Sequence, residues 1–425
     1  MILTRRTVLA VLAIAAMMIS LAGCGNTFRP TINFQPQPSG NPAPLGNAVI
    51  LSTNPAGDGS DTHIDVSGDT GAGVVTVGPS PVFLGKGFGR AFVINGNGTV
   101  TLYTALLPTS STITTLTLPA GASGPIGGGA SSNGNIYIAN SLSNNVSVIP
   151  GAQTAVTALV NVDTNPVMVA ANTSGNKVYV VNNGGNDVSV IGTADNAFVK
   201  NIMVGAQPVW GVMSDDGNDV FIVNQGDGTV SVIDTALDQV ITTITVGSLP
   251  NFAFYDNVRK RVYVTNTGSN TVSVIKADSI DLSHGVLPVK LADVTVSSPP
   301  VSIAAIADGT RAYVALGGCP AGVNHTTLLA QLGSCNGNQV AVIDAIALVQ
   351  SKVIPVGSGD VSIAASTDGT RVYTVNAHDG NISIIKTSTD AEVLRIAAPS
   401  QNLSCSNPAV CPSTAQTPFQ VVTFP

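Results

Sequence analysis

The sequence predicts an all-β chain in which one four-stranded unit is repeated around an axis, and three observations support this prediction. A short phrase returns eight times, in which an apolar or aromatic residue is followed by two mostly apolar residues and, in seven copies, by asparagine. The copies lie 41 to 60 residues apart, and helical periodicity is confined to the first 23 residues. A repeat of this length is typical of a β-propeller. The phrase begins at Leu51, Phe92, Tyr137, Tyr179, Phe221, Tyr263, Tyr313 and Tyr373.

The clearest single unit, residues 208–247, contains four short runs that are rich in β-branched residues and bounded by Gly, Asn or Asp. This composition is typical of strands joined by hairpins. The second run is almost continuously apolar, which indicates a strand covered on both faces. Sheets stacked face to face around an axis provide that environment, whereas a β-solenoid, the structural alternative, would need a shorter coil per repeat. The runs are 209–213, 220–223, 230–233 and 240–246.

The two ends of the chain predict how the ring closes. The first repeat has no first strand of its own, because a Pro- and Asn-rich stretch precedes Leu51. Residues 417–424 match the first strand of a later repeat, residues 249–254. We therefore expect the last residues to supply the innermost strand of the blade begun by residues 48–78, which leaves no open sheet edge. This count gives eight blades, with the commoner number of seven as the alternative.

The N-terminus predicts export and lipidation. Arg5 and Arg6 precede an apolar run from Val8 to Leu21, which is too short for a transmembrane helix of about 20 residues. The stretch from Leu21 to Cys24 resembles a bacterial lipobox, which implies cleavage before Cys24 and a diacylglycerol on its sulfur. We expect a lipid-anchored protein of the cell envelope that faces away from the cytoplasm, with the outer membrane or cell surface favoured. The expected segments are a lipoprotein signal peptide (1–23), a flexible tether (24–46) and the propeller (47–425).

The four remaining cysteines form two local pairs, Cys319 with Cys335 and Cys405 with Cys411. In an oxidising compartment we expect both pairs to be disulfides that fasten loops. The spacings contain no Cys-x-x-Cys, so they do not favour a metal site built from thiols.

Composition narrows the class of partner. Charged residues make up 10% of the chain, with 17 Lys and Arg against 24 Asp and Glu. Such sparse basic residues argue against nucleic acid, which is bound mainly through its phosphates. A surface rich in Asn, Ser, Thr and Gly suits hydrogen bonding to a protein or a cell-wall glycan. We expect the protein to be a monomer that touches the membrane through its lipid anchor.

The phrase Tyr-Val-x-Asn, followed by a Val-Ser-Val-Ile strand, resembles the YVTN family of β-propeller repeats. The resemblance is closest over residues 178–275, where Asn182, Asn224 and Asn266 recur at equal spacing, and it extends more loosely over residues 48–425. It implies the fold but not an activity, because relatives include surface-layer proteins, lactonase-like propellers and haem- or quinone-dependent domains. The repeat breaks at Leu316, where the asparagine is lost and a cysteine-bearing insertion begins.

Three histidines are the main candidates for a metal or catalytic site. We place His63, His325 and His378 in or beside the loops between second and third strands of consecutive blades, with Asp61 and Asp379 as partners. Such a cluster could bind a metal or take part in catalysis. The alternative is that these histidines are scattered on loops without a common role.

Other recurrent residues have mainly structural interpretations. The run 58–61, followed by Asp65, carries the oxygen ligands that calcium prefers but lacks the closing Glu of an EF-hand. No cofactor is therefore predicted, with calcium or another divalent metal as the alternative. We interpret the repeated asparagines as caps of turns and the repeated tyrosines as packing between blades.

These observations favour a binding or structural scaffold over an enzyme. The insertion between Cys319 and Cys335 is the feature expected to give specificity, because a fastened loop that departs from the repeat is ordered before it binds. The alternative is a lactonase-like or metal-dependent hydrolase with its site at the propeller channel or on the loop face.

Overall fold

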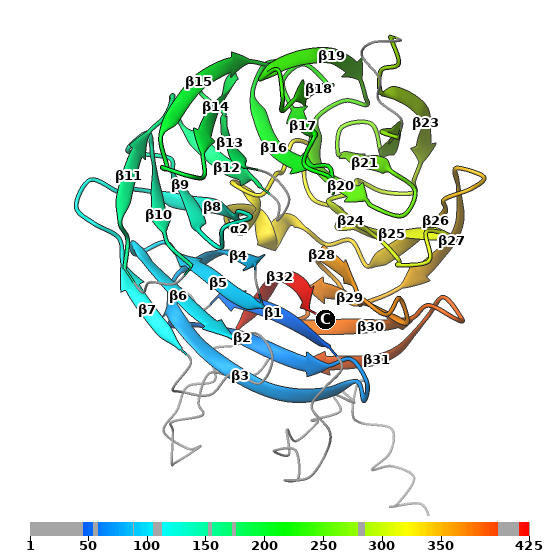
Figure 1. The fold of residues 1–425 in the computed structure, drawn as a ribbon. Coiled ribbons are helices and arrows are strands. Elements are labelled where there is room, and N and C mark those ends of the chain that lie inside the picture. Colours follow the sequence, from blue (N-terminus) through cyan, green and yellow to red (C-terminus); the bar gives the residue numbers. More distant parts are fainter. Residues whose placement is uncertain are drawn as a thin grey trace, which may run out of the picture. The chain divides into compact units, whose positions relative to one another are not determined.

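The computed structural model describes residues 46–53, 58–87, 89–104, 113–151, 155–171, 176–278, 285–397 and 416–424. These residues form eight four-stranded antiparallel sheets, arranged as the blades of a ring (Figure 1). The eight-bladed β-propeller is therefore confirmed, and the seven-bladed and solenoid alternatives are wrong. The predicted signal peptide, the tether up to residue 45 and Cys24 lie outside the described residues.

Each blade runs from an innermost strand beside the central channel to an outermost strand at the rim. Blade 1 consists of β32 (Thr417–Phe424), β1 (Asn47–Thr53), β2 (Asp58–Asp65) and β3 (Thr70–Pro79); blade 2 of β4 (Pro81–Gly87), β5 (Arg90–Asn95), β6 (Thr99–Thr104) and β7 (Thr114–Thr117); blade 3 of β8 (Pro125–Ala130), β9 (Ile136–Asn140), β10 (Asn145–Ile149) and β11 (Ala158–Asn161); and blade 4 of β12 (Pro166–Ala170), β13 (Lys177–Asn182), β14 (Asp187–Gly192) and β15 (Phe198–Met203).

The second half of the ring repeats the same order. Blade 5 consists of β16 (Pro208–Met213), β17 (Asp219–Asn224), β18 (Thr229–Asp234) and β19 (Gln239–Thr245); blade 6 of β20 (Pro250–Asp256), β21 (Arg261–Asn266), β22 (Thr271–Lys276) and β23 (Val289–Thr295); blade 7 of β24 (Ser302–Ala305), β25 (Arg311–Leu316), β26 (Gln339–Asp344) and β27 (Val349–Pro355); and blade 8 of β28 (Asp360–Ala365), β29 (Arg371–Asn376), β30 (Asn381–Lys386) and β31 (Ala391–Ala397). Helix α2 (Leu328–Gln331) and the 3-10 turn η3 (Leu332–Ser334) lie between β25 and β26. No helix within the described ranges has the length and apolar character needed to cross a membrane.

The middle strands of each blade form the hydrophobic core. All six residues of β17 are buried, whereas β19 at the rim of the same blade is mostly exposed or half-buried. Neighbouring blades cover both faces of the middle strands, which explains their nearly continuous apolar sequence. Val and Ile predominate there because β-branched side chains pack well on a pleated surface.

The C-terminal strand closes the ring as predicted. Strand β32 pairs antiparallel with β1, from Asn47 opposite Phe424 to Thr53 opposite Thr417, with one irregularity between Leu51 and Ser52. A strand from the end of the chain thereby covers the edge that β1 would otherwise expose.

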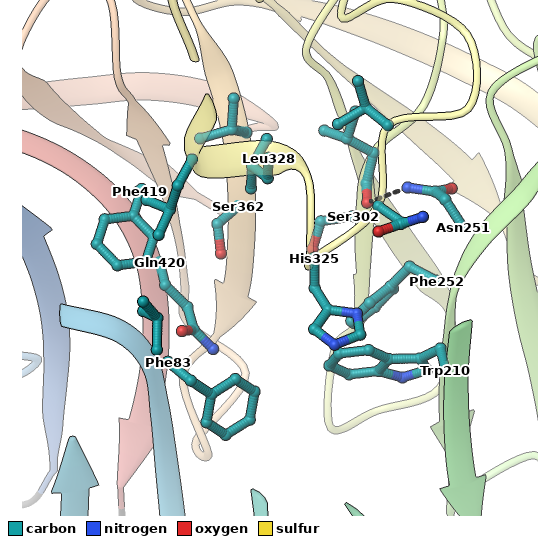
Figure 2. A pocket seen from close by; sticks show the side chains of 16 residues that line it. Phe83, Trp210, Asn251, Phe252, Ser302, His325, Leu328, Ser362, Phe419 and Gln420 are labelled. Carbon is teal, nitrogen blue, oxygen red and sulfur yellow. Dashed lines mark hydrogen bonds between the residues drawn. The ribbon is translucent and has the colours of Figure 1, made fainter. Parts of the chain in front are cut away.

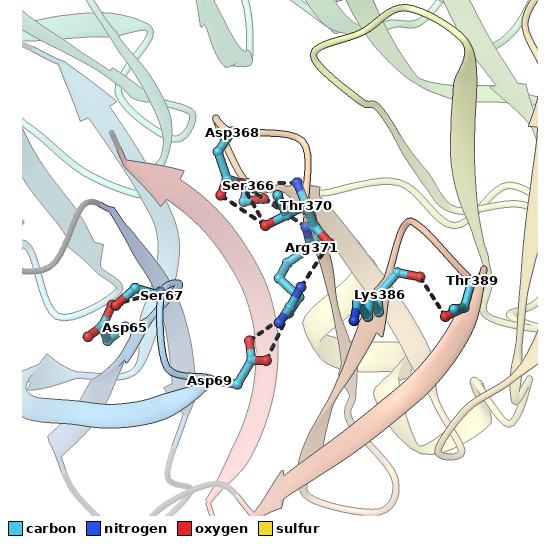
Figure 3. A network of polar contacts seen from close by, with 9 residues as sticks. All are labelled: Asp65, Ser67, Asp69, Ser366, Asp368, Thr370, Arg371, Lys386 and Thr389. Carbon is cyan, nitrogen blue, oxygen red and sulfur yellow. Dashed lines mark hydrogen bonds and ion pairs between the residues drawn. The ribbon is translucent and has the colours of Figure 1, made fainter.

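An ion pair reinforces this closure between blades 8 and 1. Arg371, at the start of β29, donates through Nε to both carboxylate oxygens of Asp69, at 2.9 and 2.8 Å (Figure 3). Asp69 lies in the turn between β2 and β3, and both side chains are less than one-fifth exposed. Partial burial reduces the screening of the pair by water, so this contact contributes more than a surface ion pair.

The repeated tyrosines join neighbouring blades, as expected. In blade 4, the hydroxyl of Tyr179 donates to Asp238 of blade 5 at 2.9 Å, and Lys177 pairs with the same carboxylate at 2.7 Å. These two contacts connect the second strand of blade 4 to the turn before the outermost strand of blade 5. The same arrangement joins blades 7 and 8 through Tyr313, Arg311 and Asp390.

The repeated asparagines are structural, but not as turn caps with a left-handed backbone. The residues with positive φ include their neighbours Asn186 and Asn270, not the asparagines that end the second strands. Asn182 instead donates through Nδ2 to Ser189 Oγ on the next strand, at 2.8 Å. The equivalent bonds in the next two blades are Asn224 to Ser231 and Asn266 to Ser273.

Candidate functional site

The insertion in blade 7 forms a cap over one mouth of the central channel (Figure 1). We use the name cap for residues 317–338, which replace the tight turn between β25 and β26 and contain α2 and η3. The predicted disulfide between Cys319 and Cys335 is confirmed and fastens the two ends of the cap together. The other predicted pair, Cys405 and Cys411, lies outside the described residues.

Hydrogen bonds attach the cap to blades other than its own. The Gly322 amide donates to Thr267 Oγ1 in blade 6 at 2.9 Å. The Asn324 side chain donates to Gln225 Oε1 in blade 5 at 2.9 Å, in a buried position. Residues of the cap also line one cavity together with Phe83 of blade 2 and Phe419 of blade 1, so the cap lies over the channel mouth.

His325 carries the cap furthest, to blade 4. Its Nε2 lies 2.9 Å from the carbonyl oxygen of Val167, which can only accept, so Nε2 holds the proton and Nδ1 is the acceptor of the neutral ring. Burial lowers the pKa of His325 to about 4, and Nδ1 is buried with no partner among the described residues. At neutral pH His325 is therefore an uncharged side chain that holds the cap to a blade three positions away around the ring.

The cavity beneath the cap is small and mostly apolar, and several aromatic rings line it (Figure 2). Its volume is about 80 Å³, and His325 packs edge-on against Trp210, with ring centroids 5.0 Å apart. Trp210 in turn contacts Phe252, at 4.7 Å between centroids. None of the described residues that line this cavity is Asp, Glu, Lys or Arg. The space is large enough for a few waters rather than for a substrate of ordinary size.

The aromatic rings of this lining were not predicted from the sequence. A signal was present nevertheless, because six lining residues occupy one repeated position, two residues after the Pro or Asp found near the start of the innermost strand. That position faces the channel in each of these blades. The six residues are Phe83, Trp210, Phe252, Ser302, Ser362 and Gln420.

His63 and Asp61 lie within strand β2 and not in the preceding loop, which corrects their expected place. Both are fully buried, and His63 packs edge-on against Tyr103 of blade 2, at 5.6 Å between centroids. The Tyr103 hydroxyl donates to Asp61 Oδ2. Burial removes the hydration of the carboxylate and raises the pKa of Asp61 to about 8. The run considered for calcium, residues 58–61 and Asp65, is thus a strand that packs against the next blade.

His378 and Asp379 occupy a third environment, the exposed turn between β29 and β30. Asp379 Oδ2 accepts a hydrogen bond from the Ser358 amide at 2.9 Å, which fixes the turn to the loop before β28. Across the part of the chain that the structure describes, no three His, Cys, Asp or Glu side chains are grouped so that they could hold a metal ion. The candidate residues therefore lie in three separate surroundings.

The longest run of basic residues, 259–261, is occupied by contacts within the propeller. Lys260 pairs with Asp215 at 2.5 Å, while Arg259 and Arg261 donate to carbonyl oxygens of blade 7. These three side chains therefore stabilise packing between blades.

A larger cavity of about 570 Å³, which we call the vestibule, opens at the other end of the channel. It is lined by the later residues of the same innermost strands whose earlier residues line the cavity under the cap. The channel thus has one mouth covered by the cap and one mouth that widens into the vestibule.

Together the fold and these two cavities define an eight-bladed β-propeller with a capped channel. The dihydro-heme d1 dehydrogenase NirN in complex with DHE is similar to it, with a TM-score of 0.64 and 14% sequence identity over 86% of this chain and 76% of that one. AztD from Citrobacter koseri is similar with a TM-score of 0.61 and 12% identity, over 89% of this chain and 98% of that one. Kuenenia stuttgartiensis hydrazine synthase is similar with a TM-score of 0.54 and 20% identity, over 73% of this chain and 97% of that one. At these sequence identities the similarity shows the fold alone, and the names of the three proteins indicate different functions. No family model and no curated protein sequence matches the chain.

Proposed function

We propose that this protein is a lipid-anchored β-propeller of the cell envelope that binds another envelope component, a protein or a glycan, through the face that carries the cap. The observation that carries the proposal is the attachment of the cap: it is closed by the Cys319–Cys335 disulfide and bonded to blades 4, 5 and 6. A loop held in this way loses little conformational entropy when a partner binds.

The outer surface of the cap suits a neutral partner that forms hydrogen bonds. Its exposed residues are small and uncharged, and they lie within α2 and η3 and on both sides of them. Electrostatic steering by such a surface is weak, so recognition would depend on shape and hydrogen bonds. The exposed residues are Pro320, Ala321, Ala330, Gly333, Ser334, Asn336 and Asn338.

The proposed location rests on the sequence. The lipobox-like stretch ending at Cys24 would attach the chain to a membrane, and the tether would hold the propeller beside it. The YVTN-like repeats support the same assignment, because that resemblance includes exported and surface-layer proteins.

Site-specific photo-crosslinking in intact cells tests the binding face. We would place a photoreactive side chain at Ser334 on the cap and, in a matched variant, at Thr389, which is exposed in the turn between β30 and β31. In a propeller blade, that turn and the insertion lie at opposite ends of the strands. We expect a discrete crosslinked product from position 334 and none of the same size from position 389.

A second variant separates binding from accidental proximity. Asn336→Arg introduces a charge at an exposed position and should leave the unfolding midpoint unchanged. It should also strongly reduce the crosslinked product from position 334. Equal products from both faces, or a product that Asn336→Arg does not reduce, would exclude the cap as the binding surface.

A further inference from the structure

The vestibule at the uncapped mouth has the size and composition of a ligand site. Its volume of about 570 Å³ lies within the usual range for small-molecule pockets. Six innermost strands contribute residues to its wall: β4, β16, β20, β24, β28 and β32. Because the cap covers the other mouth, a ligand would enter and leave from the side of the vestibule.

The wall of the vestibule is mostly apolar, and much of it consists of small residues. Alanines at matching positions of β24 and β28 keep the space open, while blade 6 adds three half-buried aromatic side chains. Half-buried aromatic rings offer faces on which a planar apolar group can pack. The alanines are Ala304, Ala305, Ala364 and Ala365, and the aromatic residues are Phe252, Phe254 and Tyr255.

Two charged residues line the vestibule, and they differ in how they are paired. Asp215 is occupied, because it pairs with Lys260 at 2.5 Å and accepts from the Tyr255 hydroxyl at 3.2 Å. Lys86, on β4, donates through Nζ to the carbonyl oxygen of Thr423 at 2.9 Å. No carboxylate among the described residues pairs with Lys86. The vestibule therefore holds one ammonium group whose bonded partner is neutral.

The position of Lys86 makes that ammonium group a potential anion site. Its side chain is exposed, but it lines the vestibule, where surrounding protein removes part of its hydration and lowers the pKa of the ammonium. A carboxylate bound to Nζ would replace the lost hydration with a charge-assisted hydrogen bond. A cation placed there would be repelled by the same charge.

We propose that the vestibule binds a small organic carboxylate with an apolar, aromatic body, whose carboxylate pairs with Lys86 and whose ring packs on the aromatic residues of β20. The location of this site, at the opposite end of the channel from the cap, makes it independent of the binding face proposed above. The charge of Lys86 selects the anionic group, and the apolar wall selects the body of the ligand.

Isothermal titration calorimetry on the full chain tests this proposal with 2-naphthoate and its neutral analogue 2-naphthamide as probes. We expect the carboxylate to bind and the amide to bind at least about tenfold more weakly, because a hydrogen bond between charged groups is lost. Lys86→Met, which keeps the length of the side chain without its charge, should weaken naphthoate binding by about 10- to 100-fold. Lys86→Arg, which keeps the charge, should retain most of the affinity.

Two further variants serve as controls. Lys386→Met removes the same charge from an exposed position on β30 and should leave naphthoate binding unchanged. Ala364→Phe narrows the vestibule without changing any charge and should weaken both probes. The proposal is overturned if the unmodified protein does not bind naphthoate, or if naphthamide binds equally well. It is also overturned if Lys86→Met has the same unfolding midpoint as the unmodified protein and keeps full affinity for naphthoate.

Discussion

Replacing Asp61 by Asn should make the propeller more stable at alkaline pH and flatten the dependence of its stability on pH. Asp61 is fully buried beside Tyr103, and burial raises its pKa from 3.8 to about 8, although the hydrogen bond from the tyrosine opposes that rise. Between these two pH values the folded protein holds a proton on Asp61 that the unfolded chain has released. Folding is therefore penalised progressively as the pH rises through this window.

The size of the effect follows from the width of the window. Each pH unit over which the folded state binds one more proton lowers the free energy of unfolding by about 1.4 kcal/mol. Over the two units from pH 6 to pH 8 the contribution of Asp61 is about 2 to 3 kcal/mol, lost as the pH rises. The raised pKa values of Asp187 and Asp219, both about 6, affect stability mainly below this range.

Urea unfolding of the unmodified protein and of Asp61→Asn at pH 6 and pH 8 measures this contribution. Asparagine cannot ionise, yet its oxygen can still accept the hydrogen bond from Tyr103. The free energy of unfolding of the variant, relative to that of the unmodified protein, should rise by about 2 to 3 kcal/mol from pH 6 to pH 8. Asp58→Asn, at the exposed start of the same strand, should leave the slope unchanged.

The reasoning is refuted if the free energy of unfolding of Asp61→Asn depends on pH as steeply as that of the unmodified protein. It is also refuted if the variant becomes less stable, relative to the unmodified protein, between pH 6 and pH 8. Either result would mean that Asp61 is ionised in the folded blade and is stabilised there as a carboxylate. Tyr103→Phe should then be more destabilising at pH 8 than at pH 6, because it removes the hydroxyl that bonds to that carboxylate.

Three further predictions concern the cap, the closure of the ring and the membrane anchor. Reduction of the Cys319–Cys335 bond, whose cysteines are 16 residues apart, should ease local opening of the cap by up to about 3 kcal/mol, measured as faster hydrogen exchange over residues 320–334. Arg371→Met breaks the ion pair between blades 8 and 1 and should lower the free energy of unfolding by about 1 to 2 kcal/mol in urea titrations. Cys24→Ser should move the protein from the membrane fraction to the soluble fraction of lysed cells.

Each of these predictions has an outcome that would contradict it. Unchanged hydrogen exchange after reduction would mean that contacts with other blades alone hold the cap. Arg395, a more exposed arginine that pairs with Glu392 in its own strand, provides the control for closure, and Arg395→Met should cost less than about 0.5 kcal/mol. If Arg371→Met lowers the free energy of unfolding by no more than Arg395→Met does, the ion pair between blades 8 and 1 has no special role in closing the ring. Retention of Cys24→Ser at the membrane would argue against a lipid anchor on that sulfur.

Local repetition made most of the fold predictable. The phrase ending in asparagine fixed the second strand of each blade, because its composition recurs wherever a strand is covered on both faces. The match between residues 417–424 and residues 249–254 fixed the closing strand for the same reason. Features that depend on a residue's neighbours along the chain were therefore accessible from the sequence.

Features that depend on distant partners were not accessible. The path of the cap is set by hydrogen bonds such as that of Asn324 to Gln225, which lies 99 residues earlier in the sequence. The residues around Asn324 do not indicate which distant residue will be its partner. The polar composition of residues 58–65 resembles a loop, yet they form the buried strand β2, in which Tyr103 of the next blade bonds to Asp61. Spacing within a repeat cannot show that a neighbouring repeat supplies the compensating hydrogen bond.

The closing strand also determines when the molecule can become complete. Strand β1 is made early, but its inner partner β32 begins only at Thr417, after all the other described strands. Until β32 has been made, blade 1 has an unpaired edge and the ring cannot shut, so the growing chain remains open along this seam. A variant that lacks β32 would keep this edge exposed, and we expect proteases to cleave it faster than the closed ring, so the order of synthesis makes blade 1 the last blade to become stable.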